Sequence, residues 1–144
     1  MGVQRMDNVA IVVEDLDATI AFFVELGLVL EDRQQIEGEF AEQAVGIPGL
    51  RSEIAMMTVP GGGGRLELTR YVEPDPVPTD PPLPNTIGLH RVMFAVDDIH
   101  DTVERLGAHG GEVLDRIANY ADVYLLCYLR GPSGIIVGLA EQIG

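Results

Sequence analysis

Two segments of the chain repeat one pattern of apolar and polar residues. Large apolar side chains recur at every second position over residues 8–13, which predicts a strand with unlike faces. Asp15 follows as a helix cap, and apolar residues then recur at helical spacing as far as Gly27. The pattern returns from Arg91, with Asp98 in the place of Asp15. The chain therefore indicates an internal duplication, with two copies arranged about a pseudo-twofold axis.

Each copy continues with apolar segments that predict three further strands. In the first copy these are residues 28–35, 50–59 and 65–71, with a short polar helix or loop at 38–46. In the second copy we predict a strand at 88–96, a helix at 99–106, and strands at 112–117, 123–130 and 135–140. Both copies then have the order strand, helix and three strands.

A proline-rich segment separates the copies. Six prolines lie between Glu73 and Asn85, a density that excludes a helix or a central strand and favours an extended linker. We therefore expect one domain of 144 residues, made of a first module at 6–71, a linker at 72–87 and a second module at 88–144.

Composition and charge limit the classes of partner. No apolar run reaches the roughly 18 residues that a membrane span needs. A net charge of −14 excludes a phosphate-binding basic stripe, so nucleic acid is not expected as a partner. The acidity would attract a cationic small molecule, although scattered acidic residues more often serve solubility alone.

Two further features concern the cell compartment. The chain starts without an apolar signal segment, so we expect a cytoplasmic protein. Cys127 is the single cysteine, which excludes an internal disulfide and a thiolate metal cluster, and its apolar surroundings predict a buried thiol.

Four motifs carry a family resemblance: VEDLDATIAFF, LEL, VDDI and GPSGIIVGLAE. With the two strand–helix–strand modules, they resemble the vicinal oxygen chelate superfamily, which includes glyoxalases, extradiol dioxygenases, methylmalonyl-CoA epimerases and bleomycin-resistance binding proteins. The resemblance implies an α+β fold in which two tandem βαβββ modules form a curved, cavity-enclosing mixed sheet, and a homodimer. In the enzymes of this family, four side chains hold one divalent ion that chelates two substrate oxygens.

The resemblance places those four ligands at positions 8, 67, 91 and 138. Here they are Asn8, Glu67, Arg91 and Gly138, so only Glu67 is a usual ligand. The sequence therefore predicts a degenerate site and no metal cofactor, with a bound divalent ion as the alternative.

His90, next to Arg91, is the residue that could restore a metal site together with Glu67. A shift of one residue along a strand turns the side chain to the opposite face, here the face covered by the helix at 99–106. Unless a bulge intervenes, we therefore expect His90 to be a structural histidine.

Glu67 and Arg91 are the candidate functional pair. The resemblance implies that they face each other from the two modules, and a buried lone charge favours an ion pair between them. Such a pair either fills a disused site or acts on a ligand, with Arg91 binding a carboxylate or carbonyl and Glu67 acting as a base or binding a cation. Possible cavity-wall residues, for most of which core packing is the alternative, are Met57, Tyr71, Met93, Tyr124 and Tyr128.

Two functions follow from these observations. The first is a small-molecule binder of the resistance or sequestration type, with a ligand site drawn from Asn8, Glu67, Tyr71, Arg91, Met93 and Tyr124. The second is an enzyme, a lyase, isomerase or dioxygenase, that uses Glu67 with His90 and a metal, or Glu67 with Arg91 in metal-free acid–base chemistry.

Overall fold

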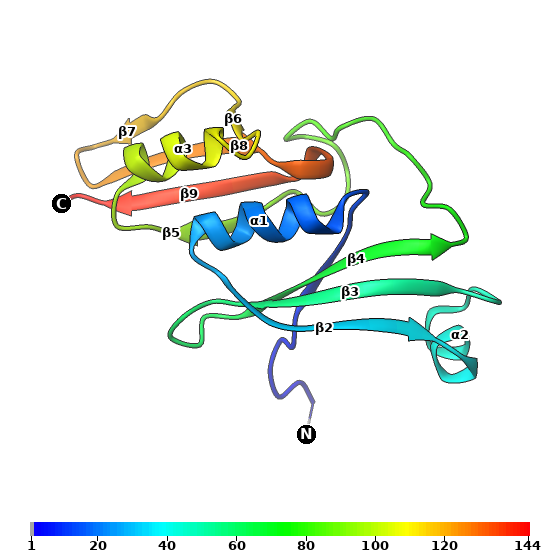
Figure 1. The fold of residues 1–144 in the computed structure, drawn as a ribbon. Coiled ribbons are helices and arrows are strands. Elements are labelled where there is room, and N and C mark those ends of the chain that lie inside the picture. The colour runs from blue at the N-terminus through cyan, green and yellow to red at the C-terminus, as the bar shows by residue number, and fades with distance from the viewer. Residues whose placement is uncertain (1) are drawn as a thin grey trace. The chain divides into compact units, whose positions relative to one another are not determined.

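A computed structural model describes residues 2–144 and divides the chain into two compact units, Met1–Pro78 and Thr79–Gly144 (Figure 1). The division falls inside the proline-rich segment. Each unit has its own sheet.

The first unit contains a mixed sheet of four strands. Its elements are β1 (Val9–Val12), α1 (Leu16–Leu26), β2 (Val29–Glu37), α2 (Glu39–Val45), β3 (Arg51–Thr58) and β4 (Arg65–Glu73). The strand order is β1-β4-β3-β2, and β1 runs parallel to β4 while the other pairs are antiparallel. The first strand of the unit thus lies beside the last one.

The second unit repeats this topology. Its elements are β5 (Val92–Ala95), α3 (Ile99–Gly107), β6 (Glu112–Val113), β7 (Ala118–Tyr120), β8 (Tyr124–Arg130), a short 3-10 turn (Pro132–Gly134) and β9 (Ile136–Gln142). The order is β5-β9-β8-β6, with β7 also paired to β8 and with β5 parallel to β9. The predicted α+β fold is confirmed. The predicted order of strand, helix and three strands is found in the first unit, and the second unit has one further short strand, β7.

The two helix starts are built alike. The carboxylate of Asp15 accepts a hydrogen bond from the amide of Ala18 at 3.0 Å, and that of Asp98 accepts from Asp101 at 3.0 Å. Buried threonines one turn later donate to the backbone oxygens of the same aspartates, Thr19 to Asp15 and Thr102 to Asp98, each at 2.7 Å. Both predicted caps are confirmed, and the matching threonines extend the duplication.

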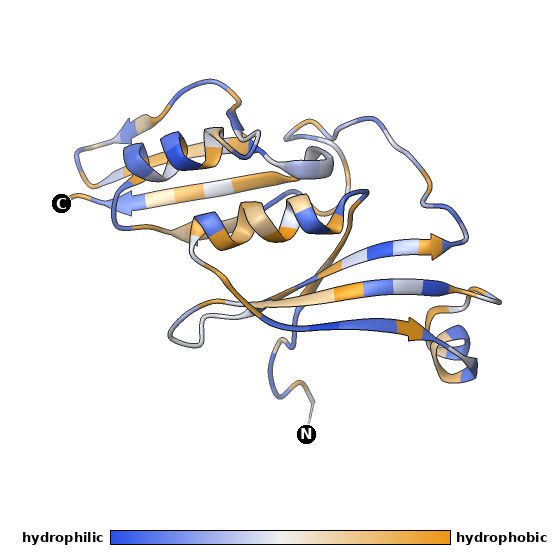
Figure 2. Cartoon of the chain, viewed as in Figure 1, coloured by the Kyte–Doolittle hydropathy of each residue, from blue (hydrophilic) through white to orange (hydrophobic). Residues whose placement is uncertain are grey.

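The core of the first unit lies between α1 and one face of its sheet. Ala55, Met57, Leu66 and Leu68 pair across β3 and β4 and are all at most 5 % exposed. The same face carries Arg33 of β2, whose guanidinium binds Asp17 of α1 at 2.7 Å. This face therefore packs under α1, which Figure 2 shows as the more apolar of the two long helices.

The core of the second unit lies between α3 and its sheet. A Cβ atom at Gly111 would lie 3.2 Å from Leu106 of α3 and 3.1 Å from Leu129 of β8, so these two leucines are neighbours. The amide of Ile99 at the start of α3 donates to the carboxylate of Glu141 in β9 at 2.7 Å. Leu129 and its alternate neighbour Cys127 thus face α3.

Burial raises the pKa of the Cys127 thiol above its ordinary value of 9.0. Above that value the unfolded chain releases the proton before the folded protein does, so this contribution to stability is complete below pH 9 and is lost as the pH rises further. Urea unfolding at pH 7 and pH 10 should show an alkaline loss of stability that is smaller in Cys127→Ala. An equal loss in both proteins would contradict the assignment.

Several predicted strand boundaries were wrong. The strand predicted at 88–96 is β5, Val92–Ala95, because its partner β9 begins only at Ile136 and offers almost no strand to pair with earlier residues. The strand predicted at 112–117 ends at Val113, after which the chain leaves the sheet before β7. The strands β2, β4 and β9 each end two residues later than predicted. The segment at 38–46, predicted as a short helix or loop, forms the helix α2. His90 and Arg91 therefore precede β5.

Candidate ligand-binding site

The sheet of the first unit has a second face, which points away from α1. Glu67 is on this face, paired with Met56 in β3 and Ala10 in β1, and its side chain is half-buried. Tyr71 follows on the same side of β4 and is also half-buried. Asn8 is half-buried and lies immediately before β1. Glu67 and Tyr71 thus share one face, which we call the reverse face of the first sheet.

The reverse face of the second sheet points away from α3 in the same way. Its centre is Gly138 of β9, which pairs with Met93 of β5 on one side and with Tyr128 of β8 on the other. Tyr124 lies on the same side of β8, opposite Tyr120 of β7, and is 40 % exposed. The predicted residues Met93 and Tyr124 are thus on one face.

Met93 occupies the space in which a side chain at position 138 would begin. A Cβ atom built on Gly138 would lie 3.0 Å from the Cγ of Met93 and 3.3 Å from its sulfur. Gly138 is itself buried. A ligand side chain at this position would therefore need Met93 to move.

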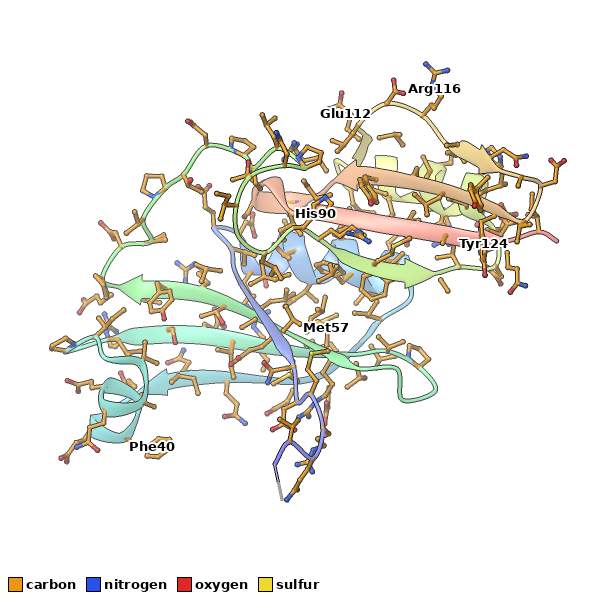
Figure 3. The ribbon with its side chains drawn as sticks, turned by 180° about the vertical axis from the view of Figure 1, so that it is seen from behind. Phe40, Met57, His90, Glu112, Arg116 and Tyr124 are labelled. Atoms are coloured by element: carbon orange, nitrogen blue, oxygen red, sulfur yellow. The ribbon has the colours of Figure 1, made fainter. Side chains whose placement is uncertain are left out.

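His90 and Arg91 gather on the ring of Tyr128. The guanidinium carbon of Arg91 lies 5.1 Å from the ring centroid, and the His90 ring meets Tyr128 edge to face at 5.4 Å. Nη1 of Arg91 lies 3.0 Å from Nδ1 of His90. We call these three residues the His90–Arg91–Tyr128 cluster; Figure 3 labels His90, in the connection that leads into β5.

The expected direction of the His90 side chain was wrong. We predicted the face covered by α3, but His90 contacts Tyr128, whose neighbour Leu129 is the residue that faces α3. The alternation of faces holds only inside a paired strand, and His90 precedes β5. No bulge was needed to bring it to the reverse face.

Met57 was a second misplaced residue. It is fully buried on the α1 side of β3, because it pairs with Leu66 of β4, so it cannot line the reverse face. Glu67 and Arg91 lie in different units, and an ion pair between them stays a prediction.

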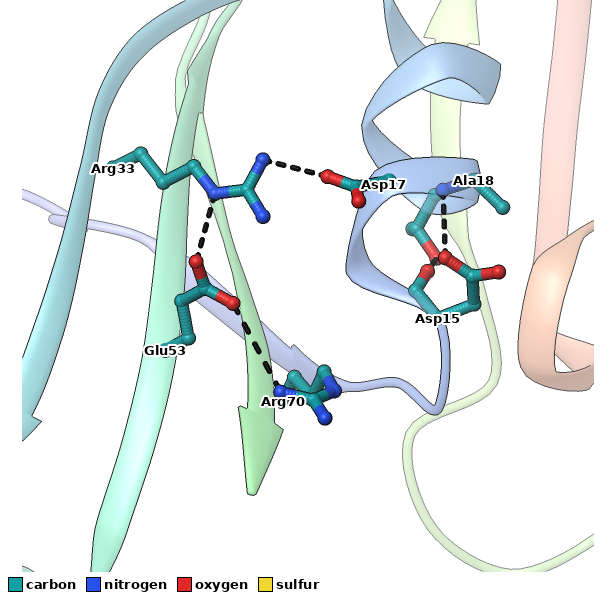
Figure 4. Close-up of polar contacts among 7 residues, drawn as sticks. Asp15, Asp17, Ala18, Arg33, Glu53 and Arg70 are labelled. Carbon is teal, nitrogen blue, oxygen red and sulfur yellow. Dashed lines mark hydrogen bonds and ion pairs between the residues drawn. The ribbon is translucent and has the colours of Figure 1, made fainter. Parts of the chain in front are cut away.

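A chain of charges on the α1 side was missed by the sequence analysis. Figure 4 shows Arg33 between Asp17, at 2.7 Å, and Glu53, at 3.0 Å, with Arg70 at 4.0 Å from the other oxygen of Glu53. Hydrogen bonds that the Arg33 guanidinium donates to the carboxylates of Glu53 and then Asp17 raise the pKa of Arg33. These residues are far apart in sequence, and only the pairing of β2, β3 and β4 brings them together.

The residues at the four positions that the family resemblance assigns to metal ligands do not fit a divalent ion. Arg91 presents a guanidinium, which donates hydrogen bonds and has no lone pair for a metal. Gly138 has no side chain, and Met93 fills the space beside it. Among residues 2–144, no group of three or more His, Cys, Asp or Glu side chains is placed to hold a metal ion.

In the same residues, no helix combines the length and the apolar character that crossing a bilayer requires.

Comparison with known proteins places this geometry in a family. Residues 5–139 match the model of the Glyoxalase/Bleomycin resistance protein/Dioxygenase superfamily. A comparison with curated proteins found no match.

Solved structures with this fold include one with high and several with low sequence identity to the chain. A glyoxalase family protein from Bacillus cereus is 46% identical over 100% of this chain and 97% of its own, with a TM-score of 0.95. Glyoxalase I from Zea mays is 19% identical over 96% of this chain and 47% of its own, with a TM-score of 0.68. TnmS3, an antibiotic binding protein from Streptomyces sp. CB03234, is 19% identical over 99% of this chain and 98% of its own, with a TM-score of 0.63.

Proposed function

The chain belongs to the glyoxalase, bleomycin resistance protein and dioxygenase superfamily, and within it we propose a small-molecule-binding protein whose inherited metal site is degenerate. The observation that carries this proposal concerns the reverse face of the second sheet. There, two of the four inherited ligand positions hold a guanidinium and a glycine, and Met93 occupies the space beside the glycine.

The chemistry of these replacements supports binding without a metal. Arginine stays protonated at every physiological pH, so it repels a divalent cation and attracts oxygen atoms of a ligand. Met93 and Tyr124 are 38% and 40% exposed and offer apolar contact area on the same face as Arg91's partner Tyr128. A face with one fixed cation and adaptable apolar side chains is suited to an organic molecule.

The comparisons include both a binding protein and an enzyme. The fold occurs in a plant glyoxalase and in an antibiotic binding protein, and a shared fold does not fix the reaction. Of the ligand-binding residues predicted from the sequence, Asn8, Glu67 and Tyr71 belong to the first unit, and Arg91, Met93 and Tyr124 belong to the second. The homodimer and the cytoplasmic location implied by the sequence remain predictions.

Metal content tests the degenerate site. The protein is purified without chelators, incubated with Ni²⁺, Zn²⁺ or Fe²⁺ and then desalted, and its metal content is measured by elemental mass spectrometry. We expect far less than one ion per chain, because three of the four expected ligand positions lack a usual metal ligand. Added metal should leave the melting temperature unchanged.

The opposite result has a clear signature. Stoichiometric metal that is lost in Glu67→Ala but retained in Glu112→Ala, an exposed glutamate of β6, would overturn the degenerate site and favour a metal enzyme. Metal retained in both variants would indicate adsorption to the acidic surface, and the degenerate site would stand.

A further inference from the structure

Arg91 is distinguished from other arginines by its missing acceptor. Its Nε atom is buried and has no hydrogen-bond partner among residues 2–144. By contrast, the Nε atoms of Arg33 and Arg116 donate to carboxylates at 3.0 and 3.1 Å, although both side chains are more exposed. A buried donor without an acceptor is costly, and its usual explanation is a missing water, ion or ligand.

His90 supplies a second buried donor. A guanidinium can only donate, so in its contact with Nη1 of Arg91 the Nδ1 atom of His90 must accept. In the neutral ring the hydrogen then lies on Nε2. Nε2 of His90 is also buried and without a partner, so the cluster offers two N–H groups that both require an acceptor.

The cluster is held in place before any ligand arrives. The Tyr128 ring contacts the guanidinium at 5.1 Å and the His90 ring at 5.4 Å, and the bond of 3.0 Å joins the two side chains to each other. Donors that are already oriented lose little freedom when an acceptor binds. The partly exposed Met93, across Gly138 from Tyr128, adds a polarizable surface that suits an aromatic ring.

Resting on the binding function proposed above, we propose that the ligand is an organic acid with an aromatic framework, whose carboxylate or equivalent oxygen anion is bound by Arg91, while the Nε2–H of His90 donates to a second acceptor. This class differs from the cationic ligand that a net charge of −14 favours. Dissolved salt screens the attraction that surface charges exert on a distant ligand. Arg91 and His90 instead act at contact distance through buried donor atoms, where a charge-assisted hydrogen bond is stronger.

Matched sets of fragments test the class of ligand. Each set carries a carboxylate, a primary carboxamide or an aminomethyl group on the same mono- or bicyclic aromatic framework, and binding is measured by ligand-observed NMR titration. We expect carboxylates to bind about tenfold or more tightly than their aminomethyl partners, since a charge-assisted bond is worth that much. Arg91→Met should weaken the carboxylates roughly 10- to 100-fold and leave the aminomethyl compounds nearly unchanged.

Two controls separate local from overall charge. Arg116→Met makes the same change in net charge at an exposed arginine and should alter carboxylate binding less than about twofold. Arg91→Lys keeps the charge but lacks Nε and the planar fork, so it should recover only part of the affinity and also shows whether a folded variant can bind.

The outcomes distinguish this inference from the proposed function. Aminomethyl compounds that bind best, or carboxylates that are insensitive to Arg91→Met in folded protein, would overturn the acid ligand and leave a small-molecule binder. An equal loss in Arg91→Met and Arg116→Met would overturn the contact as well. If no fragment of any charge binds, the binding function itself fails and the acid ligand fails with it.

Discussion

Leu68→Ala should lower the free energy of unfolding by about 2–5 kcal/mol, the range for a fully buried leucine. Leu68 is 0% exposed at the centre of β4, paired with Ala55 and Ile11 on the face that packs under α1. Truncation leaves a cavity that the paired strands on both sides cannot collapse into easily. Urea unfolding followed by circular dichroism measures the loss.

The neighbouring residue provides the matched control. Glu67 lies on the same strand but on the reverse face, so Glu67→Gln should change stability by less than about 1 kcal/mol, as is usual for a partly exposed polar substitution. A large loss in Glu67→Gln with little in Leu68→Ala would show that the two faces of β4 have been exchanged.

The duplication was predictable because its signals are local. A carboxylate cap is recognised from Asp15 or Asp98 and the few residues that follow, and the structure shows the same bond of 3.0 Å in each helix. The order of strands follows from apolar alternation in the same way. The family motifs add the expected ligand positions, because these positions lie at fixed distances in sequence from the two caps and from the final turn.

The side on which a residue lies was less predictable. Met56 and Met57 are adjacent and both apolar, so only the pairing of Met57 with Leu66 decides which one faces α1. For His90 the strand pattern itself was misleading, because strand pairing begins only at Val92. The direction of the His90 ring is set by its contact with Tyr128, 38 residues further along the chain. Such contacts depend on tertiary structure and have no local sequence signal.

The two unpaired donors were beyond reach of sequence for a further reason. A histidine beside an arginine is common, and what distinguishes this pair is burial combined with a missing acceptor. Neither property can be read from residue types. The sequence proposed a carboxylate or carbonyl for Arg91 on chemical grounds, but the role of His90 as a donor follows only from its contact with Arg91.

Gly138→Glu, which places a carboxylate at the position that the resemblance assigns to the fourth metal ligand, should destabilise the protein by about 1–3 kcal/mol or more. The new Cβ atom would lie 3.0 Å from Cγ of Met93, closer than most real Cβ contacts, and position 138 is buried. Met93→Ala removes Cγ and the sulfur, two of the three nearest atoms, so the double variant should recover about 1 kcal/mol or more of the loss. Thermal and urea unfolding of the four proteins complete the cycle.

Gly138→Ala separates the steric cost from the cost of charge. It should destabilise less than Gly138→Glu, because the end of the Met93 side chain is flexible and 38% exposed and can shift by a few tenths of an ångström. Additive effects of Gly138→Glu and Met93→Ala would refute the idea that Met93 occupies this space. A favourable coupling of about 1 kcal/mol would instead mean that both residues must change together, so a single substitution cannot return a metal ligand to this sheet.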